Sequence, residues 1–132
     1  MRYLLDTNIC IYIINQRPIQ VMARFRLERI GEIGISSLTA AELDYGVEKS
    51  GSARNRQALE KFLAPLEIVA FDDMAFRQYG RLRADLEKRS LPIGSMDMLI
   101  ASHALALNAV LVTNNTREFE RIGGPHLENW VA

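Results

Sequence analysis

Short apolar runs alternate along this chain with longer segments of helical periodicity, and this alternation limits the folds that the chain can adopt. Buried strands are predicted at Arg2–Leu5, Ile33–Ser36, Glu67–Ala70 and Ala109–Thr113. Helices are predicted near 19–30 and over 39–49, 54–64, 73–89 and 96–108. Strands that alternate with helices favour a mainly parallel sheet covered on both faces. The predicted fold class is therefore α/β, as a single α/β/α sandwich.

The secondary structure of two apolar segments is left open by the sequence. Residues 9–14 are too few for periodicity to separate a helix from a strand, and residues 127–130 suggest a last edge strand. A length of 132 residues fits one domain, predicted to span residues 1–132. The single cysteine, Cys10, cannot form an internal disulfide and is expected to be buried.

The hydropathy pattern predicts a soluble, cytoplasmic protein with no membrane partner. No apolar stretch approaches the roughly 18 residues that cross a bilayer. Asp6 interrupts the first apolar run, so no signal-peptide core develops.

Three acidic residues stand where strands end or helices begin. Asp6 closes the first apolar run, Glu42 follows the second, and Asp97 opens an apolar helix. Ligands of open α/β sheets bind outside the carboxyl ends of the strands, so these acids are expected to gather there. Carboxylates repel one another unless a cation lies between them, and all-oxygen sites suit Mg²⁺ or Mn²⁺. The pattern predicts metal-assisted chemistry on phosphate esters.

Each acid also has a structural explanation. Asp6 could cap a helix that starts near Ile9, although Thr7 or Asn8 could serve instead. Glu42 completes a capping-box sequence that begins at Thr39, unless an earlier serine caps the helix. Asp97 in a first helical turn gains about 0.3–1 kcal/mol from the helix dipole without any function.

Further polar candidates follow the last clear strand. Asn115 offers a carbonyl oxygen and Glu118 a carboxylate, yet either could be a turn residue or a helix-starting acid. Thr113 could hydrogen-bond a neighbouring carboxylate and fix its orientation.

Basic residues are balanced by acids overall. The 16 basic and 16 acidic residues give a formal net charge of zero, which argues against strong binding of nucleic acid by bulk charge. Two basic segments could still supply phosphate contacts, and the candidates are Arg17, Arg24 and Arg81. Ordinary solvated helix faces are the alternative interpretation.

Taken in order, these motifs resemble those of the PIN-domain nucleases, and specifically the VapC-type toxins of bacterial toxin–antitoxin pairs. The similarity runs nearly from end to end. It includes Leu4-Leu-Asp6-Thr7-Asn8, Ser36-Ser-Leu-Thr-Ala-Ala-Glu42, Pro92-Ile-Gly94-Ser-Met-Asp97, Leu111-Val-Thr113-Asn-Asn and Glu118-Phe119. Each piece alone is a weak signal, but the ordered set is specific.

The resemblance implies an endoribonuclease that uses Mg²⁺, or Mn²⁺ in its place, and cleaves RNA, with transfer RNA as one plausible target. It also implies a homodimer and a cognate antitoxin that carries a DNA-binding domain. By motif position, Asp6, Glu42 and Asp97 match the family's metal-coordinating acids, and Asn8 and Thr113 match its supporting polar residues.

One position departs from the family pattern. Asn115 stands where many PIN domains carry an aspartate, and Glu118 is expected to replace that charge. The expected catalytic set is therefore Asp6, Glu42, Asp97 and Glu118. Asp6 and Asp97 are predicted to hold one ion, Glu42 and Glu118 to act directly or through water, and Asn115 to give support.

Two other functions compete with a nuclease. Asn115 motivates a catalytically inactive PIN fold that serves as an RNA- or protein-binding adaptor. The place of Asp6 at a strand end motivates a phosphoryl-transfer domain, but position 8 is Asn8, where a second acid would be needed.

Overall fold

A five-stranded parallel sheet runs through the centre of the molecule. The computed structural model describes residues 1–132. Its strands, in the spatial order β3-β2-β1-β4-β5, all pair in parallel with their neighbours. They are β1 (Tyr3–Leu5), β2 (Ile33–Ser36), β3 (Glu67–Val69), β4 (Val110–Val112) and β5 (Leu127–Glu128).

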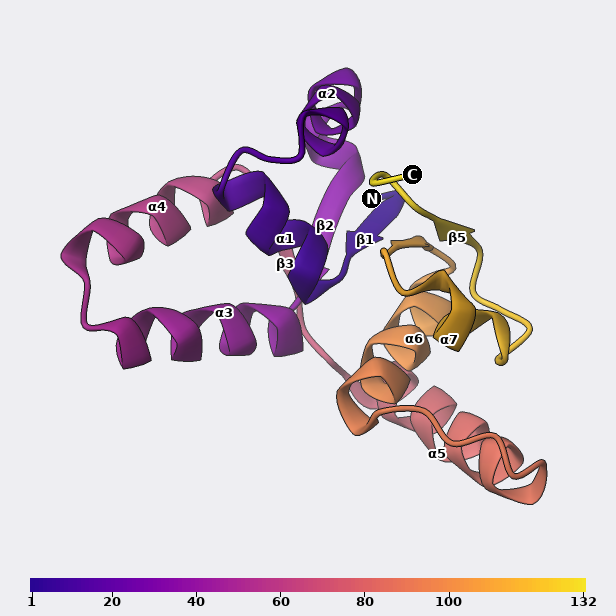
Figure 1. The fold of residues 1–132 in the computed structure, drawn as a ribbon. Coiled ribbons are helices and arrows are strands. Elements are labelled where there is room, and N and C mark those ends of the chain that lie inside the picture. Colours follow the sequence, from indigo (N-terminus) through magenta and orange to yellow (C-terminus); the bar gives the residue numbers. More distant parts are fainter.

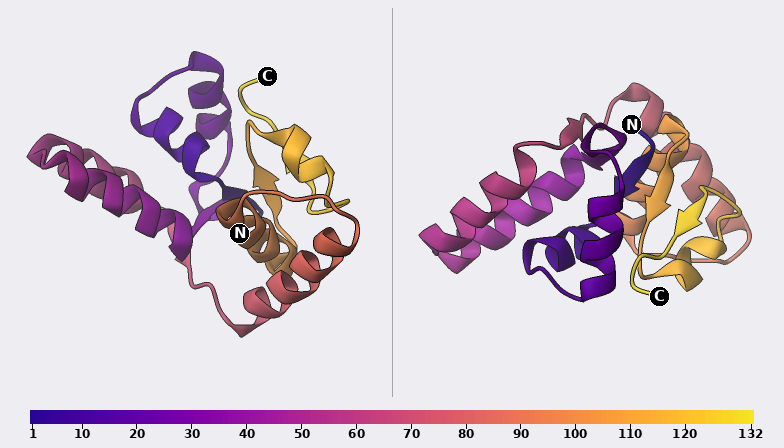
Figure 2. Two further views of the ribbon diagram at one scale, coloured as in Figure 1. Left: turned by 60° about the horizontal axis from the view of Figure 1, so that its bottom comes forward. Right: turned by 90° about the horizontal axis from the view of Figure 1, so that it is seen from above.

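Helices cover both faces of this sheet (Figures 1 and 2). One group comprises α1 (Thr7–Ile14), α2 (Ile19–Leu27), α3 (Ser37–Ser50) and α4 (Ala53–Leu63). The other comprises α5 (Asp73–Lys88), α6 (Ser95–Leu107) and α7 (Thr116–Glu120). The pair α3 and α4 projects from the sheet on the side away from α5 (Figure 1). The predicted α/β/α sandwich is confirmed.

The sheet divides the hydrophobic core into two clusters, one on each face. Successive side chains of a strand point to opposite faces. Tyr3 and Leu5 accordingly belong to the apolar cluster beneath α1–α4, whereas Leu4 belongs to the cluster beneath α5–α7. All three are at most 1% exposed, which explains why β1 is apolar at every position. Cys10 is buried, as predicted.

Local hydrogen bonds decide where the helices begin. The undecided segment 9–14 is helical, because the carboxylate of Asp6 accepts a hydrogen bond from the Ile9 amide at 2.9 Å and caps α1. The Ser36 hydroxyl accepts from the Leu38 amide at 3.1 Å, so α3 starts at Ser37, two residues earlier than predicted.

Other boundaries differ from the predictions. The helix predicted near 19–30 ends at Leu27, because Glu28 has an extended backbone, and a short 3₁₀ turn over Ile30–Glu32 precedes β2. The short helix α7 was not predicted from the sequence, and β5 spans only two residues. No helix is both long and apolar enough to cross a membrane.

The order of the strands creates a crevice beside β1. The chain moves from β1 outward to β2 and β3, and then returns to the other side of β1 with β4. Ligands of open α/β sheets bind at such a reversal, outside the carboxyl ends of the strands. Asp6 follows β1 directly and Thr113 follows β4, so both residues lie at the edge of this crevice.

Candidate active site

The three acids chosen from the sequence meet at one depression. Asp6, Glu42 and Asp97 line a cavity of about 170 Å³ together with Thr7, Asn8 and two apolar side chains of α6. They come from the cap of α1, from the second turn of α3 and from the first turn of α6. Residues 91 positions apart along the chain, Asp6 and Asp97, thus share one site because parallel strands place their carboxyl ends side by side.

Asp6 serves both the fold and the site. Burial raises the pKa of Asp6 above its usual range, while hydrogen bonds from Thr113 and the Ile9 amide oppose this rise, and the charge of Glu42 adds to it. The structural explanation given for Asp6 is therefore correct, since it caps α1, yet its side chain also lines the depression. A carboxylate can do both because each oxygen accepts more than one bond.

Glu42 does not close a capping box. The helix is capped by Ser36, so Thr39 lies inside α3 and Glu42 is free to reach the depression. Its Oε1 atom accepts a hydrogen bond from the hydroxyl of Thr7, a residue that was not predicted to belong to the site. The position of Thr7 next to Asp6 was the only signal that could have indicated this role.

Asp97 and Glu118 form a close acidic pair. Burial and the nearby charge of Glu118 raise the pKa of Asp97 to about 6, and Asp6 and Glu42 contribute smaller repulsions. Burial also acts to raise the pKa of Glu118, but hydrogen bonds from the Gly94 amide, Asn115 and Asp97 outweigh it and lower that pKa. The two groups share negative charge that favours a proton or a cation between them.

The supporting residues are also near the site, in differing roles. Asn8 lines the depression and is exposed. Thr113 is fully buried, hydrogen-bonds Asp6 and accepts from the Asn115 amide at 3.0 Å. The Asn115 side chain donates to Glu118 Oε2 at 2.7 Å, so this residue orients an acid and does not itself line the depression.

The predicted RNA-binding arginines differ in their surroundings. Arg17 and Arg81 are exposed. Arg24 instead forms ion pairs with Glu28 and Glu128 at 3.0 and 2.9 Å, and its guanidinium lies over Trp130. This arrangement favours a structural role for Arg24 over the predicted phosphate contact.

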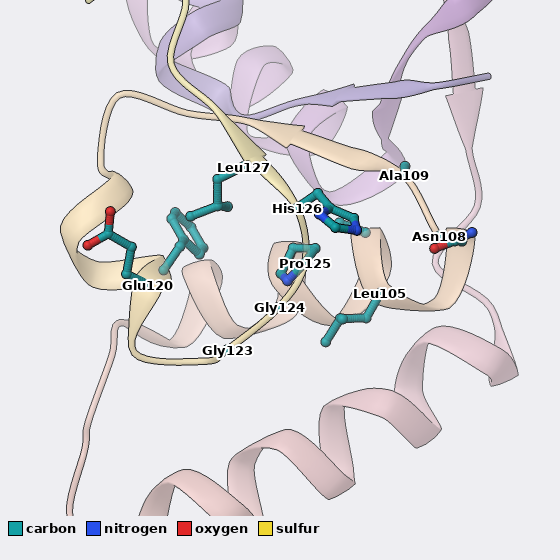
Figure 3. Close-up of a pocket in the computed structure, with 11 residues that line it drawn as sticks. Leu105, Asn108, Ala109, Glu120, Gly123, Gly124, Pro125, His126 and Leu127 are labelled. Carbon is teal, nitrogen blue, oxygen red and sulfur yellow. The ribbon is translucent and has the colours of Figure 1, made fainter.

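A separate cavity lies at the opposite end of the sheet. It has a volume of about 510 Å³ and is bounded by the end of α6 and by the segment before β5, including Leu105, Asn108, Gly124 and His126 (Figure 3). None of the four acids lines it. Because it sits at the amino ends of β4 and β5, it is not part of the acidic site.

The donor set of the depression suits a small divalent cation. No group of three His, Cys, Asp or Glu side chains is arranged to hold an ion on its own. Mg²⁺, however, keeps several waters and uses only one or two carboxylates. Burial and the neighbouring acids raise the pKa of Asp97, so a cation beside this carboxylate would relieve the repulsion. Asp6 and Asp97 are the donors that best fit such an ion.

Comparisons with known proteins indicate the family of this chain. The PIN domain family matches residues 3–125. The chain is 49% identical to Ribonuclease VapC2 of Rickettsia felis and 43% identical to the tRNA(fMet)-specific endonuclease VapC of Shigella flexneri, with 98% of each chain covered in both cases.

Solved structures show a similarity to the same group of proteins. The crystal structure of DNA-bound VapBC from Salmonella typhimurium superposes with a TM-score of 0.90 at 41% identity, covering 98% of both chains. VapBC2 from Rickettsia felis, bound to a DNA fragment from its promoter, superposes with a TM-score of 0.87 at 46% identity, covering 98% of this chain and 99% of that one.

The fold is that of a PIN domain, and the chain belongs to the PIN-domain family. Within that family its similarity is to the VapC-type ribonucleases over nearly its whole length.

Proposed function

We propose that this chain is the toxin of a toxin–antitoxin pair, an endoribonuclease that hydrolyses RNA with a divalent cation held by its acids. Residues 1–132 act as one nuclease domain. The observation that carries this proposal is the meeting of Asp6, Glu42 and Asp97 from three separate elements in one depression. The names of the relatives favour an enzyme over an inactive adaptor.

The residues of the site divide the work. Asp6 and Asp97 would hold the ion, with Mg²⁺ as the expected metal and Mn²⁺ as its substitute, and Glu42 and Glu118 would act directly or through water. When bound, the ion neutralises charge on the phosphate and lowers the pKa of the attacking water. Thr7 keeps Glu42 in place, and Thr113 fixes Asp6. Asn8 would add a polar contact at the rim.

Substrate contacts are expected outside the acids. Arg17 and Arg81 are exposed and available for phosphate oxygens. One relative is named as a tRNA(fMet)-specific endonuclease, which supports transfer RNA as the substrate class.

The test compares two substitutions at Asp6. Asparagine is as good a helix cap as aspartate, whereas alanine is not, so Asp6→Asn should keep the stability of α1 and Asp6→Ala should lose about 1 kcal/mol. Both variants should lose RNA cleavage, because neither can supply the anionic oxygen. Cleavage of transfer RNA by the purified wild-type protein should require Mg²⁺ and stop with EDTA. Wild-type rates in Asp6→Asn would refute the metal mechanism.

This chain has a groove next to the acids that is suited to binding the antitoxin. A cavity of about 320 Å³ lies between α1, α3 and α4, with apolar walls that include Ile11, Leu43 and Leu59. Thr7 and Glu42 line both this groove and the acidic depression. An apolar segment of the antitoxin bound there would reach the acids and block access of RNA. The related VapBC structures contain toxin and antitoxin together.

A homodimer is also expected. Exposed apolar side chains on the edge strand β3 and at the start of α5 support self-association. Ile68 of β3 is 47% exposed, and Met74 and Phe76 of α5 are each 57% exposed. Light scattering of the purified protein gives the mass directly.

A further inference from the structure

The segment that leads into α6 has no helix or strand of its own. Residues 91–94 return from the far end of α5 to the first turn of α6 (Figure 1). Asp97 lies in that first turn, so the course of this segment determines where Asp97 stands relative to Asp6 and Glu42.

Helix α7 and its C-cap residue Arg121 hold this segment by two hydrogen bonds, one donated to the segment and one accepted from it. Arg121 Nη1 donates to the carbonyl oxygen of Pro92 at 3.1 Å. The amide of Gly94 donates to Glu118 Oε1 at 2.7 Å. The other oxygen of Glu118 accepts from Asn115 at 2.7 Å, so the carboxylate is itself fixed. A third contact, from Arg89 Nη1 to the carbonyl of Arg121 at 3.4 Å, joins the end of α5 to the same helix.

Gly94 transmits the effect of these contacts to the acid. It is the residue before α6 and has no side chain to cap the helix, and its own amide donates to Glu118, which fixes the backbone at the start of α6. A methyl group built at Gly94 would lie 3.5 Å from Asp97 Oδ2 and 3.8 Å from Glu118 Oε1. The three residues therefore share one small volume, and a shift of residues 92–94 displaces Asp97.

We propose that Arg121 is a positioning residue of the active site: by binding Pro92 it fixes residues 92–94 and thereby the place of Asp97 opposite Asp6. This inference rests on the proposed nuclease function. Arg121 is itself exposed, and exposed contacts of this kind add little to global stability. Its loss should therefore affect the site more than the fold.

The experiment compares Arg121→Met with Arg121→Lys and with Arg117→Met, which removes another exposed arginine of α7. Calorimetry with Mn²⁺ should show about 10- to 100-fold weaker binding for Arg121→Met, as for losses of outer hydrogen bonds around metal ligands. RNA cleavage should show a lower kcat with an unchanged KM, and the melting temperature should stay that of the wild type. Arg121→Lys keeps a donor for Pro92 and should recover most of the affinity.

Amide hydrogen exchange separates this inference from the nuclease function. In Arg121→Met the amides of Gly94 to Asp97 should exchange faster than in the wild type, and in Arg117→Met they should not. Equal Mn²⁺ affinity in the two methionine variants, or unchanged exchange at these amides, overturns the role of Arg121. If the wild-type protein itself binds no Mn²⁺ and cleaves no RNA, the nuclease proposal fails, and the exchange data alone decide whether Arg121 places Asp97.

Discussion

At the scale of single residues, the position of Asp97 among other acids reduces the stability of the fold. Its carboxylate is half-buried among acids, so in the folded protein its pKa rises from 3.8 to about 6. A raised acid pKa means that folding favours the protonated form. The stabilising contribution is therefore complete at low pH and is lost as pH rises through about 6.

This pH dependence of stability leads to a prediction for the metal-free protein. In EDTA at about pH 8, Asp97→Asn should be more stable than the wild type by on the order of 1 kcal/mol, after allowance for solvent screening. Near pH 4 the difference should be small, because the wild-type acid is then largely protonated. Urea unfolding at the two pH values measures it. Added Mn²⁺ should stabilise the wild type and leave Asp97→Asn unchanged.

One outcome would contradict this prediction for Asp97→Asn. If Asp97→Asn is less stable than the wild type at both pH values in EDTA, then Asp97 contributes hydrogen bonds that outweigh the repulsion of its neighbours.

Asp6 and Glu42 show how far single residues could be interpreted from sequence. Asp6 caps α1 and its side chain also lines the depression, so its capping role is compatible with the proposed catalytic role. For Glu42 the capping box was wrong, because Ser36 and not Thr39 caps α3. Local sequence leaves several serines and threonines as candidate caps, and only the path of the chain from β2 selects one.

At the scale of elements, α3 is anchored by one buried hydroxyl. Ser36 Oγ accepts from the Leu38 amide and pairs with His103 Nδ1 of α6 at 2.8 Å. Both side chains are at most 1% exposed. Burial lowers the pKa of His103, so the ring is neutral in the fold and is held by Ser36 and by the edge of Phe71. Ser36 therefore links the helix that carries Glu42 to the helix that carries Asp97.

Removal of this hydroxyl should cost much stability. We expect Ser36→Ala to lower the free energy of unfolding by about 2 kcal/mol, since it removes a helix cap and leaves a buried imidazole nitrogen without a partner. Ser50→Ala at the other end of α3, where the hydroxyl is exposed, should stay within about 0.5 kcal/mol of the wild type. Chemical denaturation of both variants measures the difference, and equal losses would exclude this role for Ser36.

The stability effect of His103 has a definite pH dependence. Because burial lowers the pKa of His103 in the fold, the unfolded chain takes up a proton first as pH falls. The contribution of His103 is thus present above its ordinary pKa of 6.5 and decreases below it.

At the scale of the whole molecule, the groove between α1, α3 and α4 is the antitoxin site that we propose, and it shares Thr7 and Glu42 with the acidic depression. Ala58 of α4 lines this groove, whereas Ala53 of the same helix is exposed outside it. Ala58→Glu would place a charge in an apolar groove, which is costly unless the charge is paired.

Ala58→Glu is therefore expected to weaken binding of the cognate antitoxin by at least tenfold, about 1.4 kcal/mol, while RNA cleavage without antitoxin is retained. Ala53→Glu should bind the antitoxin as the wild type does. Calorimetry with purified antitoxin and an RNA cleavage assay test the pair. If inhibition of Ala58→Glu by the antitoxin is undiminished, the antitoxin binds elsewhere.

The sequence alone determined the fold class and which acids were candidates for the site. Apolar runs such as Ile33–Ser36 and periodic segments such as 73–89 are local properties, and they appear in the structure as β2 and α5. Acids at strand ends are also visible locally, because a strand that ends in a carboxylate must expose it or give it a partner.

Tertiary structure alone decided which groups touch. The contacts of Thr7 with Glu42, of Gly94 with Glu118 and of Arg121 with Pro92 join residues that are 35, 24 and 29 positions apart. No local pattern encodes them, since they arise only when the parallel strands bring α1, α3, α6 and α7 to one edge of the sheet. The same assembly placed Glu118 of α7, a helix of five residues, against the Gly94 amide that precedes α6.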